Sequence, residues 1–190
     1  TIGSVDAYPR TNAGSSALSA TCDGVNHTAS GTATLVVAPK PVTIALAGLG
    51  SFPYDGNVHA ATASVVGEVA GFPAATVPSY NGAGAAPSAV GVYDVIATLA
   101  PAASNYSAPG ANGTIIIGAA NATVAIANLA QVYDGTPRTV TVTTNPTGLA
   151  TSVTYDGSAT PPSNAGTYTV VATITAPGYS GSASATLVVA

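Results

Sequence analysis

The chain has 190 residues, of which only 3 are Lys or Arg and 7 are Asp or Glu, so its formal net charge is -4. It therefore has no basic stripe for nucleic-acid phosphates and no basic amphipathic face for a membrane surface. Its mean hydropathy is +0.42, but polar residues, Gly and Pro interrupt every apolar run before the roughly 20 residues that a membrane-spanning helix needs. We expect neither nucleic-acid binding nor membrane insertion.

The chain repeats itself. Residues 12–37 align without a gap with residues 164–189, and 11 of these 26 positions are identical. A looser copy lies between them, because three residues recur at an offset of 75. These are Tyr80, Gly91 and Tyr93, which recur as Tyr155, Gly166 and Tyr168. The offset of 152 thus corresponds to two periods of about 76 residues, and this length of repeat indicates an array of small domains.

The first piece of the chain, residues 1–38, matches only the second half of a repeat. It has an Asn-Ala-Gly turn and two long strands, but no Tyr-Asp-Gly turn and no earlier strands. Half a sandwich exposes its inner face and edges, so we expect it to be completed by preceding residues of a longer chain or by a neighbouring chain. Cys22, the only cysteine, lies in an alternating strand pattern and is expected to be a buried thiol.

Two full repeats follow, at residues 39–118 and 119–190, and the first of them carries an insertion at residues 67–78. Short β-branched runs bounded by Gly, Pro and Asn predict strands throughout, and helix punctuation is absent. In the last repeat the predicted strands cover residues 123–126, 139–143, 168–174 and 185–189. The pattern predicts an all-β fold of antiparallel β-sandwiches in a linear array.

Three Tyr-Asp-Gly triplets predict structural turns, in which Asp accepts a bond from the backbone two residues on and Gly takes a positive φ. A calcium site is the alternative, but calcium needs about six to eight oxygen ligands, and acidic residues are sparse here. The triplets are Tyr54, Asp55 and Gly56; Tyr133, Asp134 and Gly135; and Tyr155, Asp156 and Gly157.

Two further tyrosines, Tyr93 and Tyr168, each follow a glycine by two residues near the start of a long strand. A tyrosine at this place in a sandwich often ties down a nearby loop with its hydroxyl, so we expect a structural role. Stacking on a sugar is the functional alternative.

Catalytic chemistry is not expected. The only histidines are His27 and His59, the latter in a Thr/Ala-rich strand pattern, and neither has an acidic residue or cysteine at ligand spacing. No Gly-x-Ser-x-Gly turn is found among the many serines. We therefore predict no catalytic residue, no metal and no cofactor.

Three segments of the last repeat carry a resemblance to a known family. These are YDGTPRTVTV at 133–142, VTYDGSATPPSNAGTYTVVATI at 153–174 and GYSGSASATLVV at 178–189. They resemble the MBG/YDG-type bacterial immunoglobulin-like repeats of large surface or secreted proteins. The resemblance implies tandem immunoglobulin-like sandwiches, an extracellular or cell-surface location and no enzymatic activity.

Three functions remain open. The first is a structural segment of a surface fibre or adhesin stalk, whose partners are further repeats of the same parent chain. The second is a filament subunit whose incomplete first domain is completed by another copy, an arrangement that scarce charge on the strand edges would not oppose. The third is an adhesive module that binds a surface glycan, with Phe52, Phe72 and Tyr80 as its candidate surface.

Overall fold

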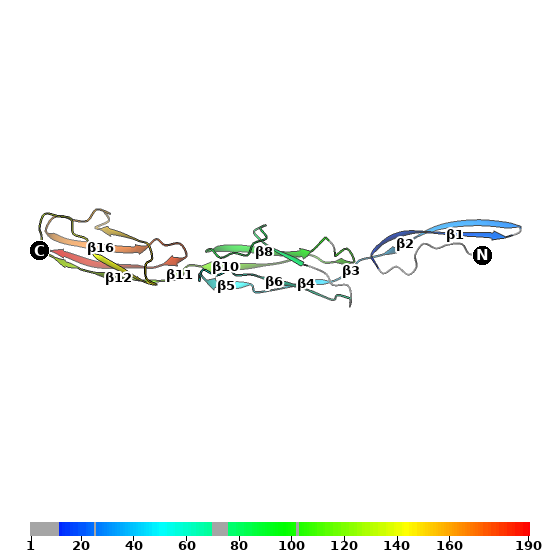
Figure 1. The fold of residues 1–190 in the computed structure, drawn as a ribbon, viewed down its shortest axis with the longest axis horizontal. Coiled ribbons are helices and arrows are strands. Elements are labelled where there is room, and N and C mark those ends of the chain that lie inside the picture. The colour runs from blue at the N-terminus through cyan, green and yellow to red at the C-terminus, as the bar shows by residue number, and fades with distance from the viewer. Residues whose placement is uncertain (1–11, 25, 70–75, 102) are drawn as a thin grey trace. The chain divides into compact units, whose positions relative to one another are not determined.

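The computed structural model describes residues 12–24, 26–69, 76–101 and 103–190 (Figure 1). All the regular secondary structure in this part of the chain is β-strand. None of the described residues form a helix able to cross a membrane. The chain divides into two compact units. One comprises residues 1–49, 60–86 and 94–114, and the other comprises residues 50–59, 87–93 and 115–190.

The first unit begins with a long two-stranded hairpin. Its strands are β1 (Gly14–Gly24) and β2 (His27–Val37), which pair antiparallel from Gly14 opposite Val37 to Gly24 opposite His27. No other strand joins this sheet in the described residues. Alternating side chains therefore place Leu18 and Leu35 on one face, and Ser19 and Thr32 on the other.

The middle repeat contains eight described strands. β3 pairs parallel with β9, β4 pairs antiparallel with β6, and the remaining four form a sheet in the order β5-β10-β8-β7. The strands are β3 (Lys40–Pro41), β4 (Thr43–Ala47), β5 (Gly50–Pro53), β6 (Thr62–Val66), β7 (Thr76–Tyr80), β8 (Gly91–Leu99), β9 (Tyr106–Ser107) and β10 (Ala111–Gly118).

The last repeat uses the same plan strand for strand. β11 pairs parallel with β17, β12 pairs antiparallel with β14, and the sheet order is β13-β18-β16-β15. The strands are β11 (Ala120–Asn121), β12 (Thr123–Ala127), β13 (Ala130–Gln131), β14 (Thr141–Asn145), β15 (Thr151–Tyr155), β16 (Gly166–Ile174), β17 (Tyr179–Ser180) and β18 (Ser182–Val189). The predicted all-β fold of tandem sandwich repeats is confirmed.

The core of the last repeat lies between its four-stranded sheet and the smaller sheet β12–β14. Four buried residues of the larger sheet form one cluster, which comprises Tyr155, Val170, Leu187 and Val189. Ile126, from β12 of the smaller sheet, and Val140, just before β14, pack against it. The middle repeat buries Val95, Ala97, Ile115 and Ile117 on the corresponding strands β8 and β10. Both repeats thus bury apolar side chains of the two corresponding long strands.

The first and third predicted strands of the last repeat lie within two residues of their predicted ends, and the fourth begins three residues earlier than predicted, at Ser182. The second is shifted as a whole by two residues. It was predicted at residues 139–143 and is observed as β14, Thr141–Asn145. The preceding backbone bonds to side chains instead of to a strand. The carbonyl of Thr139 accepts from Gln131 Nε2 at 2.9 Å, and the amide of Val140 donates to Tyr155 Oη at 3.2 Å.

Several predictions fall outside the described part of the chain. Phe72 lies in the undescribed residues 70–75, and the side chains of Cys22 and His27 are likewise not described. His59 is described and is not in a strand, contrary to prediction, because the chain from residue 54 to residue 61 is a loop.

We predict that Leu187→Ala destabilises the last repeat by about 2–5 kcal/mol, because a fully buried leucine is replaced by a cavity. Urea unfolding of the full chain would measure this loss. Val188→Ala is the matched control, since the neighbouring side chain is 44% exposed on the opposite face. Equal losses in the two variants would contradict the assignment of the inner face.

Candidate functional site

Two of the three Tyr-Asp-Gly triplets lie just after β5 and β13, and in each of them the aspartate bonds to the residue two positions on. In the middle repeat Asp55 Oδ1 accepts from the amide of Asn57 at 2.9 Å, and Asp55 Oδ2 accepts from Asn57 Nδ2 at 3.0 Å. In the last repeat Asp134 Oδ1 accepts from the amide and the hydroxyl of Thr136, at 2.9 and 2.6 Å. Gly56 and Gly135 have φ values of 77° and 80°, which only glycine adopts freely.

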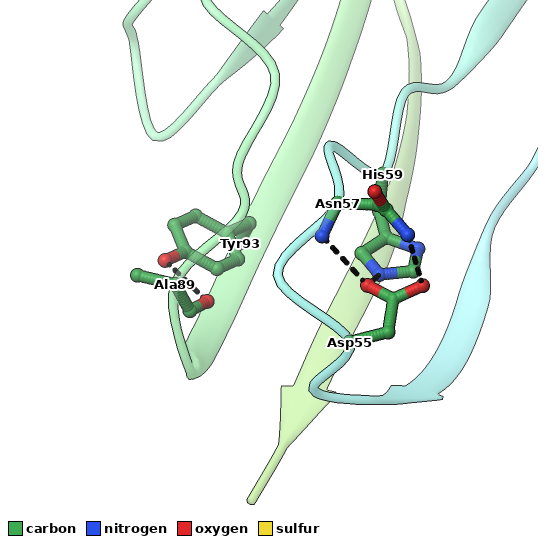
Figure 2. Close-up of polar contacts among 5 residues, drawn as sticks. All are labelled: Asp55, Asn57, His59, Ala89 and Tyr93. Atoms are coloured by element: carbon green, nitrogen blue, oxygen red, sulfur yellow. Dashed lines mark hydrogen bonds and ion pairs between the residues drawn. The ribbon is translucent and has the colours of Figure 1, made fainter. Parts of the chain in front are cut away.

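Each of these two aspartates also pairs with a basic side chain four residues on. His59 Nε2 lies 3.1 Å from Asp55 Oδ1, and Figure 2 shows both Asn57 and His59 bonded to the Asp55 carboxylate. Arg138 Nη2 lies 2.6 Å from Asp134 Oδ2 in the last repeat. The sequence analysis missed both pairs, although the shared spacing Asp-Gly-x-x-basic was a signal for them.

The His59 ring is further held by an aromatic neighbour. It stacks on Phe52 with ring centroids 4.6 Å apart and an interplanar angle of 25°. A carboxylate, an imidazole and an aromatic ring thus lie together where β5 of the middle repeat leads into the following loop. No group of three or more His, Cys, Asp and Glu side chains that could hold a metal ion is found among the described residues.

The hydrogen bonds lower the pKa of both aspartates. The side-chain bond from Asn57 is the largest cause for Asp55, followed by the backbone bond from Asn57 and then by the bond and charge of His59. The Thr136 hydroxyl is the largest cause for Asp134. A carboxylate with a lowered pKa stabilises the fold above its unfolded pKa, and that contribution disappears as the pH falls through the folded value. Both carboxylates are therefore ionised at neutral pH, and their hydrogen bonds stabilise the loops.

The third Tyr-Asp-Gly triplet is a different kind of turn, contrary to the prediction that its aspartate bonds two residues on. Asp156 and Gly157 both have positive φ, at 47° and 84°, and Tyr155 exchanges two backbone bonds with Ser158. This is the two-residue hairpin turn that Asp-Gly favours. Because Tyr155 pairs with Val170 of β16, the next residue lies beside Thr169, and Asp156 Oδ1 accepts from the amide of Thr169 at 2.7 Å.

The middle repeat has the same hairpin turn without the triplet. Asn81 and Gly82 have φ values of 49° and 82°, and Asn81 Oδ1 accepts from the amide of Asp94 at 2.7 Å. An Asn-Gly pair directly after an alternating strand is a strong signal for a hairpin. The sequence analysis missed it because the pair is not part of a Tyr-Asp-Gly triplet.

Tyr80 is not part of an exposed binding surface, and its assignment to one was wrong. Only 5% of it is exposed, and its hydroxyl accepts from the amide of Ala61 at 2.9 Å. Its counterpart Tyr155 is also buried and accepts from the amide of Val140. These rings carry hydroxyls that satisfy backbone groups across the sandwich, which explains why a polar aromatic residue occupies the core.

Tyr93 and Tyr168 make matching local bonds. The Tyr93 hydroxyl donates to the carbonyl of Ala89 at 3.0 Å (Figure 2). The Tyr168 hydroxyl donates to the carbonyl of Asn164, also at 3.0 Å, and each acceptor lies four residues before its tyrosine. The rings lie over Gly91 and Gly166, where an added Cβ would stand 3.1 and 3.2 Å from the tyrosine oxygen. Glycine at these positions thus leaves room for the ring.

The first tyrosines of the triplets differ in their surroundings. Tyr54 is half-buried and meets Tyr179 edge to face, with ring centroids 5.4 Å apart. Tyr133 is 52% exposed. The same three-letter turn therefore does not impose one environment on its tyrosine.

A family model described as the MBG domain matches residues 42–121 and 122–190 of the chain. The two matched segments adjoin, and each contains one two-stranded antiparallel pair with its four-stranded sheet. No curated protein matches the chain.

We predict that Asn57→Ala raises the pKa of the Asp55 carboxyl toward its ordinary value of 3.8, because the largest cause of its lowering is removed. A pH titration followed by NMR of the carboxyl carbons would measure this change. Asp134 is the internal control and should titrate as in the parent protein. An unchanged Asp55 would contradict the assigned cause.

We also predict that Tyr168→Phe destabilises the last repeat by about 0.5–1.5 kcal/mol, the usual net value of one hydrogen bond. Denaturant unfolding would detect the loss, with Tyr133→Phe as the control, because that ring is exposed. If both variants were as stable as the parent protein, the Tyr168 hydroxyl would have no structural role.

Proposed function

We propose, because the chain belongs to the MBG domain family, that it is a non-enzymatic structural segment of an extracellular bacterial surface fibre or adhesin stalk. Its partners would be further repeats of the same parent chain. The observation that carries this proposal is the recurrence of one eight-strand plan in two adjoining segments. A repeat array of this kind adds length in equal steps, since each added repeat brings the same set of strands.

The chemistry of the turns supports the same proposal. The Asp55–His59 and Asp134–Arg138 pairs hold loops, and the tyrosine hydroxyls satisfy backbone groups. These conspicuous side chains have structural partners that account for their positions. A spacer needs stable small domains, and such local bonds stabilise each domain without a ligand.

The filament subunit is the second candidate function. The observation that favours it is the hairpin β1–β2, whose Leu18, Leu35 and Val37 are only half-buried. A neighbouring copy that covered this face would join subunits end to end. The third alternative, a glycan-binding module, has lost Tyr80 from its candidate surface, and no contact among the described residues favours it.

Two measurements would test the proposal. The first is protease treatment of intact source cells, and the second is the mass of the native protein under denaturing conditions. We expect peptides from residues 42–190 to be released before lysis and the mass to be many times the 18.1 kDa of this chain. Peptides recovered only after lysis would contradict a surface location. A mass near 18.1 kDa would instead favour the filament subunit.

A further inference from the structure

The hairpin β1–β2 has the strand register of the hairpin β16–β18. Gly14 faces Val37 and Thr21 faces Ser30, as Gly166 faces Val189 and Thr173 faces Ser182. Every pair between these limits recurs at the same offset of 152 residues. The hairpin is therefore the second half of a repeat in structure as well as in sequence.

Because register decides which face each side chain occupies, the two hairpins have corresponding inner faces. In β16–β18 the inner face carries Val170, Leu187 and Val189, which are 0%, 0% and 3% exposed. The residues at the same positions of β1–β2 are Leu18, Leu35 and Val37, which are also apolar. The outer face of β1–β2 carries Ser and Thr at most positions, as the outer face of β16–β18 does.

The last repeat shows what covers such an inner face. Tyr155 and Val153 of β15, Ile126 of β12 and Val140 before β14 all pack against the cluster or belong to it. All of them precede β16 in the chain, so they form the first half of the repeat. In β1–β2 the corresponding leucines and valine are only half-buried.

We propose that the apolar face of β1–β2, formed by Leu18, Leu35 and Val37, is a docking surface for the first half of an MBG-type repeat. The occupant brings strands equivalent to β12, β14 and β15, with aliphatic residues and one tyrosine facing inward. A second copy of this chain does not offer such strands freely, because its own are paired within closed repeats. The inference does not depend on the surface location proposed above.

One position of the docking face departs from the repeat. Ser16 stands where Tyr168 packs against the core and donates its hydroxyl to Asn164. The hairpin therefore lacks this local bond and a large ring, and we expect the completed half-repeat to be less stable than the last repeat.

A graft within the full chain tests the proposal. A copy of residues 119–163 replaces residues 1–11, so that it joins Asn12 as Ser163 joins Asn164 in the last repeat. The control graft carries Ile126→Asp and Val153→Asp in the copy, which place charges against the docking face. We expect hydrogen exchange of the β1–β2 amides to slow by on the order of 100-fold in the first graft relative to the control.

Two results would overturn the inference. The first is equal exchange of the β1–β2 amides in both grafts. The second is strong protection of these amides in the unmodified chain that rises with protein concentration, since a second copy would then be the occupant. Neither result bears on the surface location, which the protease experiment tests separately.

A reciprocal exchange guards against a graft that fails to fold. Residues 164–189 of the last repeat are replaced by a copy of residues 12–37, which has the same length. If the hairpin is a matching second half, the hybrid repeat unfolds cooperatively, and Ser16→Tyr in the copy raises its stability. A hybrid that stays unfolded with and without Ser16→Tyr would also overturn the inference.

Discussion

The register of the long antiparallel hairpin is the constraint on which each repeat depends. Side chains alternate between faces along a strand, so pairing Thr167 with Val188 commits Val170 and Leu187 to the core and Val171 to solvent. A slip of one residue would exchange the two faces. Ile126 of the smaller sheet packs against the face that this register forms, and so the core follows from the register.

The polar contacts at the turns restrain this register. Asp156 ties the tight turn to the amide of Thr169 in β16, and Asn81 ties the equivalent turn to Asp94 in β8. A carboxylate and an amide oxygen thus perform one task in two repeats. The Tyr168 hydroxyl fixes the entry to β16 from the other side. Few charged side chains are needed to hold these turns, because the hydrogen bonds of Asp156, Asn81 and Tyr168 are short and go to backbone groups.

The two exposed aspartates illustrate how the same scaffold tolerates different chemistry. Asp134 pairs with Arg138, whose charge is permanent, whereas Asp55 pairs with His59, which is charged only when protonated. In both loops hydrogen bonds from the residue two positions on also hold the carboxylate, and they are the largest causes of its lowered pKa. The basic partner is therefore an addition to an existing turn, which explains why its identity can change.

Much of the fold could be read from the sequence, because strand alternation and turn chemistry depend on adjacent residues. The period, four of the eight strands of the last repeat and the half-repeat in the first 38 residues were predicted in this way, although one of the four strands is shifted by two residues. Burial of Tyr80, the bond from Thr169 to Asp156 and the Asp55–His59 pair were decided only by tertiary structure. Tyr80 and Asp156 bond to backbone groups 19 and 13 residues away, so sheet pairing determines their environment. The path of the loop after Gly56 determines whether His59 reaches the carboxylate.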